Sequence, residues 1–213
     1  TAPLTGPSWE GWIEPPAYTG KPAIYLNDLA GGDVALPVNS EVILRLYGEV
    51  GQLSVAETVS GRTGEVPPAT DIEQGFLLTR DGDLSIEGPG GRTWQVTLIP
   101  DQPPSLSVAG EVETSARGEM SLPFVAEDEY GVVGGGAVIA LDLAALPRRY
   151  GLAVAPDPRA DLTAELPLPI SGDRTEFQES LIEDYSKHPW AHLPVTVSLS
   201  AEDAAGQIGV AAP

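Results

Sequence analysis

Short segments in which apolar residues alternate with polar ones recur along the whole chain. In the segment 41–48, Val42, Leu44 and Leu46 stand between neighbours that are mostly polar. A period of two predicts a β-strand with one face in a core. The segment 92–99 has the same period, so its apolar residues should also point inward.

Comparable segments, separated by turns rich in Gly, Pro, Asn and Asp, occur at short intervals throughout the sequence. Many short strands joined by turns are typical of a β-sandwich, so the predicted fold class is all-β. A long loop is predicted for 144–164, where the signals are mixed. The predicted strands cover residues 23–26, 34–38, 41–48, 53–59, 75–79, 84–87, 92–99, 105–109, 119–126, 132–143, 165–171, 176–182 and 195–201.

Two of these segments need comment. Phe177, Leu181 and Tyr185 are spaced four apart as on a helix, but the segment is too short for its period to decide. A strand over 176–182 is favoured because 195–201 needs a partner in an all-β domain. Within 132–143, three consecutive glycines predict a bulge or a close approach of another backbone.

A proline-rich connector divides the chain. Pro100-Asp101-Gln102-Pro103-Pro104 has three prolines in five residues, which cannot pair as a central strand. The 213 residues also suffice for two domains of ordinary size. The prediction is therefore two tandem immunoglobulin-like, fibronectin III-like β-sandwiches, residues 1–102 and 103–213.

An acidic turn occurs twice, each time after an apolar strand. Glu127, Asp128 and Glu129 form the first, and Glu202 and Asp203 the second. Oxygen donors of this kind could converge on Ca²⁺. Neither turn has the spaced ligands of a dedicated calcium loop, and such residues are also ordinary in turns. The same carboxylates could form a glycosidase pair, but nothing in the sequence indicates a cleft, so hydrolysis is disfavoured.

Three aromatic residues lie in the proline-rich N-terminal segment 9–22, which is predicted to be an extended edge segment. Trp9, Trp12 and Tyr18 either form an exposed stacking surface or cover the core. Burial is the commoner role of large aromatic side chains and is favoured here.

Two histidines flank a tryptophan in the segment 185–193. His188 and His192 could bind a metal from one face of a helix, but Pro189 and Pro194 oppose a helix. We therefore favour a compact corner, in which Trp190 packs and the histidines cap backbone groups.

Composition narrows the possible functions. With 31 acidic and 11 basic residues, the net charge of −20 opposes binding to nucleic acid or an anionic membrane. The sequence has no cysteine, so disulfides and thiol chemistry are excluded. No catalytic or cofactor motif occurs, and a non-enzymatic role is expected. The chain has no run of 18 apolar residues and does not start like a signal peptide, so we expect a soluble region.

Four separated motifs resemble a bacterial family, domain of unknown function 4175. They are P-P-A-Y-T-G-K-P at 15–22, P-D-Q-P-P at 100–104, E-D-E-Y-G-V at 127–132, and H-P-W-A-H-L-P-V at 188–195 with A-E-D-A-A-G-Q at 201–207. The family usually carries a basic residue where Gln102 stands and a glycine where His192 stands, which makes His192 a poor candidate for a shared role.

The resemblance implies an alphaproteobacterial inner-membrane protein with transmembrane helices before this region and a glutamine-rich region after it. It supplies no activity. The expected function is a non-catalytic periplasmic spacer or protein-interaction module, whose partner would be an unknown envelope protein. The alternatives are a cell-wall glycan-binding module that uses exposed aromatic residues, and a calcium-stabilised, adhesion-like array.

Overall fold

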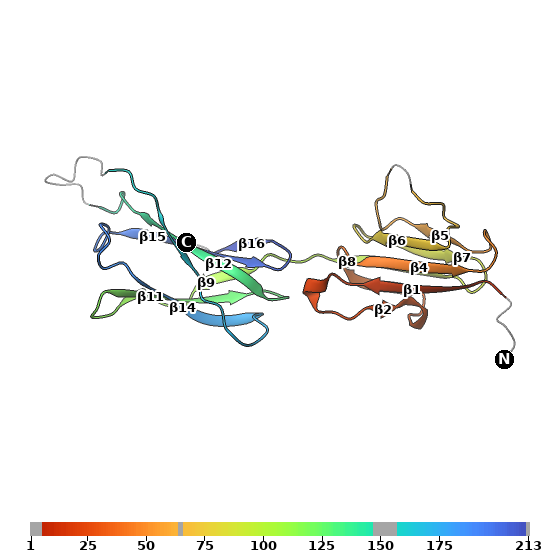
Figure 1. Cartoon of the computed structure of the whole chain (residues 1–213), viewed down its shortest axis with the longest axis horizontal. Coiled ribbons are helices and arrows are strands. Elements are labelled where there is room, and N and C mark those ends of the chain that lie inside the picture. The colour runs from red at the N-terminus through yellow and green to blue at the C-terminus, as the bar shows by residue number, and fades with distance from the viewer. Residues whose placement is uncertain (1–5, 64–65, 147–156, 212–213) are drawn as a thin grey trace. The chain divides into compact units, whose positions relative to one another are not determined.

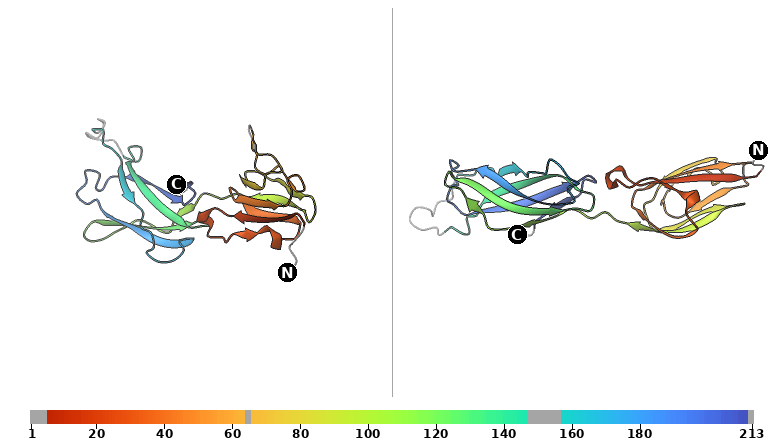
Figure 2. Two further views of the ribbon diagram at one scale, coloured as in Figure 1. Left: turned by 45° about the vertical axis from the view of Figure 1, so that its right-hand side comes forward. Right: turned by 90° about the horizontal axis from the view of Figure 1, so that it is seen from below.

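The computed structural model describes residues 6–63, 66–146 and 157–211, and the chain forms two compact units, Thr1–Asp101 and Gln102–Pro213. The division falls one residue before the boundary expected from the prolines. Each unit, taken by itself, consists of two layers of β-strands (Figures 1 and 2). Helical structure in the described residues is limited to two short 3-10 turns, η1 (Ala17–Thr19) and η2 (Leu26–Asp28). The predicted all-β class is confirmed.

The first unit pairs two four-stranded sheets. One sheet is antiparallel, in the order β2-β1-β4-β6; in the other, with the order β3-β8-β7-β5, β3 runs parallel to β8. The bounds are β1 Ser8–Glu14, β2 Ile24–Tyr25, β3 Gly32–Pro37, β4 Glu41–Tyr47, β5 Ser54–Glu57, β6 Glu73–Leu77, β7 Gly82–Glu87 and β8 Arg92–Ile99.

The second unit has the strand partition of an immunoglobulin-like sandwich. β11 pairs with β9, β10 and β14 in one sheet, and the other has the order β13-β12-β15-β16. β12, β15 and β16 therefore share a sheet that faces the sheet of β9, β11 and β14, as strands C, F and G face strands A, B and E in immunoglobulin folds. The bounds are β9 Ser105–Val108, β10 Glu113–Thr114, β11 Glu119–Glu127, β12 Val132–Leu141, β13 Leu162–Glu165, β14 Glu176–Asp184, β15 Val195–Asp203 and β16 Ile208–Val210.

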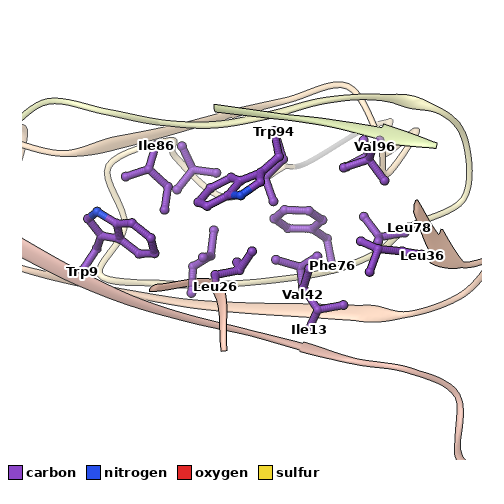
Figure 3. Close-up of a cluster of buried hydrophobic side chains, with 14 of the residues drawn as sticks. Trp9, Ile13, Leu26, Leu36, Val42, Phe76, Leu78, Ile86, Trp94 and Val96 are labelled. Atoms are coloured by element: carbon purple, nitrogen blue, oxygen red, sulfur yellow. The ribbon is translucent and has the colours of Figure 1, made fainter. Parts of the chain in front are cut away.

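The core of the first unit is built around two tryptophans (Figure 3). Trp9 and Trp94 meet edge to face with ring centres 5.8 Å apart. Each indole N–H donates to a backbone oxygen, of Gly90 at 2.8 Å and of Ala30 at 3.1 Å respectively. Because these donors are satisfied, both large rings are buried without the cost of an unpaired polar group.

The core of the second unit is built from smaller side chains than that of the first. Phe124 and Phe177 meet edge to face at 6.2 Å, and Leu181 and Leu199 are almost fully buried beside them. The strand predicted at 176–182 is confirmed, since it forms most of β14. A bulge is present, but it lies just before the three glycines: the pairing register shifts between Val132 and Gly134, and the glycines themselves pair regularly with β15. A Cβ on Gly135 would lie 2.8 Å from the backbone oxygen of Ser200.

Several expected boundaries are wrong. The strand expected at 165–171 lies earlier, as β13, because Pro167 and Pro169 lack the N–H that a sheet ladder requires. The strand expected at 23–26 is cut to two residues by η2, and that at 53–59 is reduced to β5. Part of the loop expected at 144–164 lies outside the described residues.

The N-terminal segment also differs from the expected edge strand. β1 is hydrogen-bonded on both sides, to β2 and to β4, and the proline-rich stretch begins only after it. Tyr18 lies in η1 and is half-exposed. The prolines thus end β1 and do not define its character.

Candidate functional site

The alternation of β1 separates the aromatic residues that the sequence grouped together. Trp9, Gly11 and Ile13 face the core, whereas Trp12 lies on the outward face of the sheet and is partly exposed. Trp9 is only 6% exposed and cannot stack on a ligand. Of the three residues proposed for a stacking surface, Trp12 is the one that lies on the outward face in the middle of the sheet.

Trp12 is part of a row that crosses the whole sheet. Register places Tyr25 opposite Trp12, Trp12 opposite Ile43, and Ile43 opposite Gly75. The rings of Trp12 and Tyr25 are 5.5 Å apart at a tilt of 41°. A Cβ on Gly75 would meet nothing within 4 Å, so the row ends in open space.

Sequence reasoning missed Tyr25, Ile43 and Gly75 as neighbours of Trp12. The period of two assigns a residue to a face of its strand, but it does not say which residue stands opposite. The outward face of β4 was visible in the sequence. Its register with β1, β2 and β6 was not.

Charged residues border the row on both sides. Glu10 stands opposite Arg45, which stands opposite Glu73, and the Arg45 Nε lies 3.7 Å from the Glu73 carboxylate. The Arg45 guanidinium is 6.0 Å from the centre of the Trp12 ring, within the range of a cation–π contact. On the other side, Glu14 and Glu41 are directly opposite one another.

Two tyrosines on this face have raised pKa values, each with a different main cause. The Tyr47 hydroxyl donates to Glu10 Oε2 at 2.8 Å, and this hydrogen bond is the main reason that the pKa of Tyr47 is raised. Desolvation raises the pKa of Tyr25, and the charges of Glu10 and Asp28 raise it further. Both shifts disfavour a phenolate, as expected beside carboxylates.

The acidic turns have a different geometry, in which each aspartate organises its own loop. Asp128 Oδ2 accepts hydrogen bonds from the backbone N–H of Tyr130 at 2.9 Å and of Gly131 at 2.7 Å. Asp203 Oδ1 accepts one from the N–H of Gln207 at 2.7 Å. These are turn-stabilising contacts of the kind that Asp commonly makes.

The first acidic turn borders an open hollow of about 480 Å³. Four carboxylates line this hollow. Glu202 and Asp203 of the second turn are not among its lining residues. Asp128 Oδ1 and Asp203 Oδ2 are buried and accept no hydrogen bond. Within the described residues, no group of three or more Asp, Glu or His side chains is arranged to hold a metal ion. The hollow is lined by Gln102, Pro103, Ser105, Glu127, Asp128, Glu129, Thr175 and Glu176.

Comparison with known proteins identifies the family. The family model described as "Domain of unknown function (DUF4175)" matches residues 1–213. The chain belongs to this family. None of the curated proteins matches the DUF4175 chain in sequence.

One solved structure similar to the DUF4175 chain is the crystal structure of chicken CNTN1 FN1-FN3 domains. The two share 12% sequence identity, with 88% of this chain and 67% of that chain covered and a TM-score of 0.31. Because a TM-score of 0.31 is too low to carry an argument, the fold assignment rests on the strand topology described above. In the described part of the DUF4175 chain, no helix is long and apolar enough to cross a membrane.

The histidines of the DUF4175 chain lie in a corner between β14 and β15, as expected. His188 Nδ1 accepts a hydrogen bond from the backbone N–H of Trp190 at 3.2 Å, and the two rings meet edge to face at 5.0 Å. His192 is exposed and has a φ of 64°, the left-handed region that favours glycine. The backbone role of His188 and the exposed position of His192 favour a structural corner.

Proposed function

We propose that this DUF4175 region is a non-catalytic protein-interaction module, or a spacer that carries one, in the periplasmic part of a membrane-anchored bacterial protein. The observation that carries the proposal is the outward face of the β2-β1-β4-β6 sheet. Aromatic, aliphatic and charged side chains gather there on one face of the sheet, which suits contact with another macromolecule.

The periplasmic location is supported by the family resemblance, which implies membrane helices outside this region. The acidic surface is compatible with an envelope protein that must stay soluble at high local concentration. The partner would be another envelope protein.

Photo-crosslinking in intact cells tests the proposal. A photoreactive residue is placed in the full-length protein at exposed positions on both units: Gly75, Gln95, Val138 and Ile182. We expect a discrete adduct from at least one position, and protease must reach the region from the periplasmic side only. Absence of adducts at every position, together with turnover of a glycan or peptide substrate by the purified chain, would contradict the proposal.

A glycan-binding module is the second candidate, because Trp12 is partly exposed with Tyr25 beside it. Soluble peptidoglycan fragments should then shift the indole N–H signal of Trp12 and leave that of Trp9 unchanged. A calcium-stabilised array would instead show a melting temperature that rises with Ca²⁺ and falls with chelator.

A further inference from the structure

We propose that the outward face of the β2-β1-β4-β6 sheet docks a positively charged peptide segment of a partner protein. This inference rests on the proposed interaction function and deepens it, since it names the surface and the chemistry of the segment that binds there. We call this surface the aromatic row face; it consists of Tyr25, Trp12, Ile43 and Gly75 with the flanking residues Glu10, Glu14, Glu41, Arg45, Tyr47, Glu73 and Leu77.

The centre of the aromatic row face offers contact area. Trp12, Tyr25 and Ile43 are each partly exposed, and Leu77 is 48% exposed at the rim. Gly75 leaves open space next to Ile43, where a side chain of the bound segment can lie. Aromatic residues supply large contact area at low cost in conformational entropy, which is why they dominate interface energetics.

The charge of the face selects a cationic segment. The face carries four carboxylates, those of Glu10, Glu14, Glu41 and Glu73, and one guanidinium, that of Arg45. Like charges directly opposite one another on a sheet are destabilising, and Glu14 and Glu41 are such a pair. A bound Lys or Arg would relieve this repulsion.

The face also shows that a cationic group is compatible with its aromatic centre. Arg45 already lies 6.0 Å from the Trp12 ring centre, and more than half of its side chain is exposed. The adjoining Tyr25 ring offers a second π surface for a cation from outside. A second copy of this chain is a poor occupant, because each copy carries a net charge of −20.

Two variants with the same change of net charge separate site-specific binding from general attraction. Gly75→Arg places a guanidinium over the row, in a strand position where the added side chain has room. Gln95→Arg places one on β8, on the outward face of the opposite sheet. The probe is an acetylated and amidated nonapeptide of three Lys-Leu-Pro repeats, titrated into the 213-residue chain by calorimetry and by NMR of the backbone and indole N–H groups.

We expect the Lys-Leu-Pro peptide to shift signals of Trp12, Ile43 and Gly75, and its affinity to fall as salt is added. Gly75→Arg should weaken the binding by about tenfold or more, because it brings like charges together. Gln95→Arg should change it by less than about twofold. A peptide of three Glu-Leu-Pro repeats should not bind.

Three outcomes would overturn the inference: no binding of the basic peptide, equal weakening by both variants, or shifts of Trp12 with peptidoglycan fragments in place of the peptide. A partner crosslinked at another surface would still support the proposed interaction function after any of these outcomes. Failure of this inference is therefore distinguishable from failure of the proposed interaction function.

Discussion

At the scale of single residues, the two turn aspartates connect the sequence repeat to stability. Asp128 is 8% exposed and Asp203 3% exposed, yet each carboxylate meets backbone N–H groups of its own loop. A buried charge that accepts such bonds is tolerated, and removing it leaves the donors without partners. Turn chemistry thus accounts for one oxygen of each of these aspartates, Asp128 Oδ2 and Asp203 Oδ1.

Asp128→Ala should destabilise the second unit by roughly 1–3 kcal/mol, because the N–H groups of Tyr130 and Gly131 lose their acceptor. The measurement is urea unfolding monitored at Trp190. Glu202→Ala is the control, since its side chain is exposed and should change stability by less than about 0.5 kcal/mol. Equal effects of the two variants would contradict the role assigned to Asp128.

His192 offers a prediction of the opposite sign. Its φ of 64° strains a residue that has a Cβ, so His192→Gly should stabilise the second unit by about 0.5–1 kcal/mol, after allowing for the greater freedom of glycine in the unfolded chain. His192→Ala keeps the Cβ and should bring no such gain. Thermal unfolding of the two variants beside the parent chain decides between strain and an unrecognised role of the imidazole.

Glu57 links stability of the first unit to pH. Burial raises the pKa of Glu57, but hydrogen bonds from Ser60 and from Arg62, at 3.1 Å, outweigh burial, and the pKa is lowered below its ordinary 4.5. The ionised carboxylate therefore stabilises the fold above pH 4.5, and this contribution is lost as pH falls through the folded-state pKa.

Glu57→Gln should accordingly lower the urea midpoint of the first unit at pH 7, and the difference from the parent chain should shrink below pH 4.5. Taking the difference at each pH cancels the general effect of protonating the other carboxylates. A difference that stays constant with pH would show that Glu57 acts through packing and not through its charge.

At the scale of elements, the ends of the β11–β14 ladder carry like charges. Glu127 stands opposite Glu176, and Glu119 opposite Asp184. Among the described strands β14 lies at the edge of its sheet, and charged residues on edge strands oppose pairing with another chain. We interpret the acidic pairs as a protection against aggregation that costs some stability.

Glu176→Gln should stabilise the second unit by roughly 0.2–1 kcal/mol at low salt, because it removes the repulsion from Glu127. Glu165→Gln makes the same charge change on β13, opposite Gly136, and should have a smaller effect. The gain of Glu176→Gln should decrease as salt screens the pair. Unfolding at two salt concentrations measures both effects.

Elements also show how far the sequence can be followed. The inward positions of β4 and β8 were predictable because a period of two states directly which residues share a face. The end of β2 and the position of β13 were not predictable. Each depends on a short local feature, the turn η2 in one case and the prolines after β13 in the other. The aromatic row face needed register across four strands, which depends on contacts between segments distant in sequence.

At the scale of the whole molecule, the described residues form two hydrophobic cores, one in each unit. Each of these two clusters lies within one unit, so each unit has its own source of cooperative stability. Two such units need not unfold together, and a single free energy of unfolding is then not defined for the chain.

Phe124→Ala tests this independence. Phe124 is fully buried in the second unit, and its truncation should cost that unit about 3–5 kcal/mol. The indole N–H signal of Trp190 should then be lost at lower urea, whereas those of Trp9 and Trp94 should disappear at the parent midpoint. Phe76→Ala in the first unit is the matched control and should give the reverse pattern. If either variant moved all of the indole transitions together, the units would share one cooperative core, and the outward sheet faces could no longer be treated as properties of separate sandwiches.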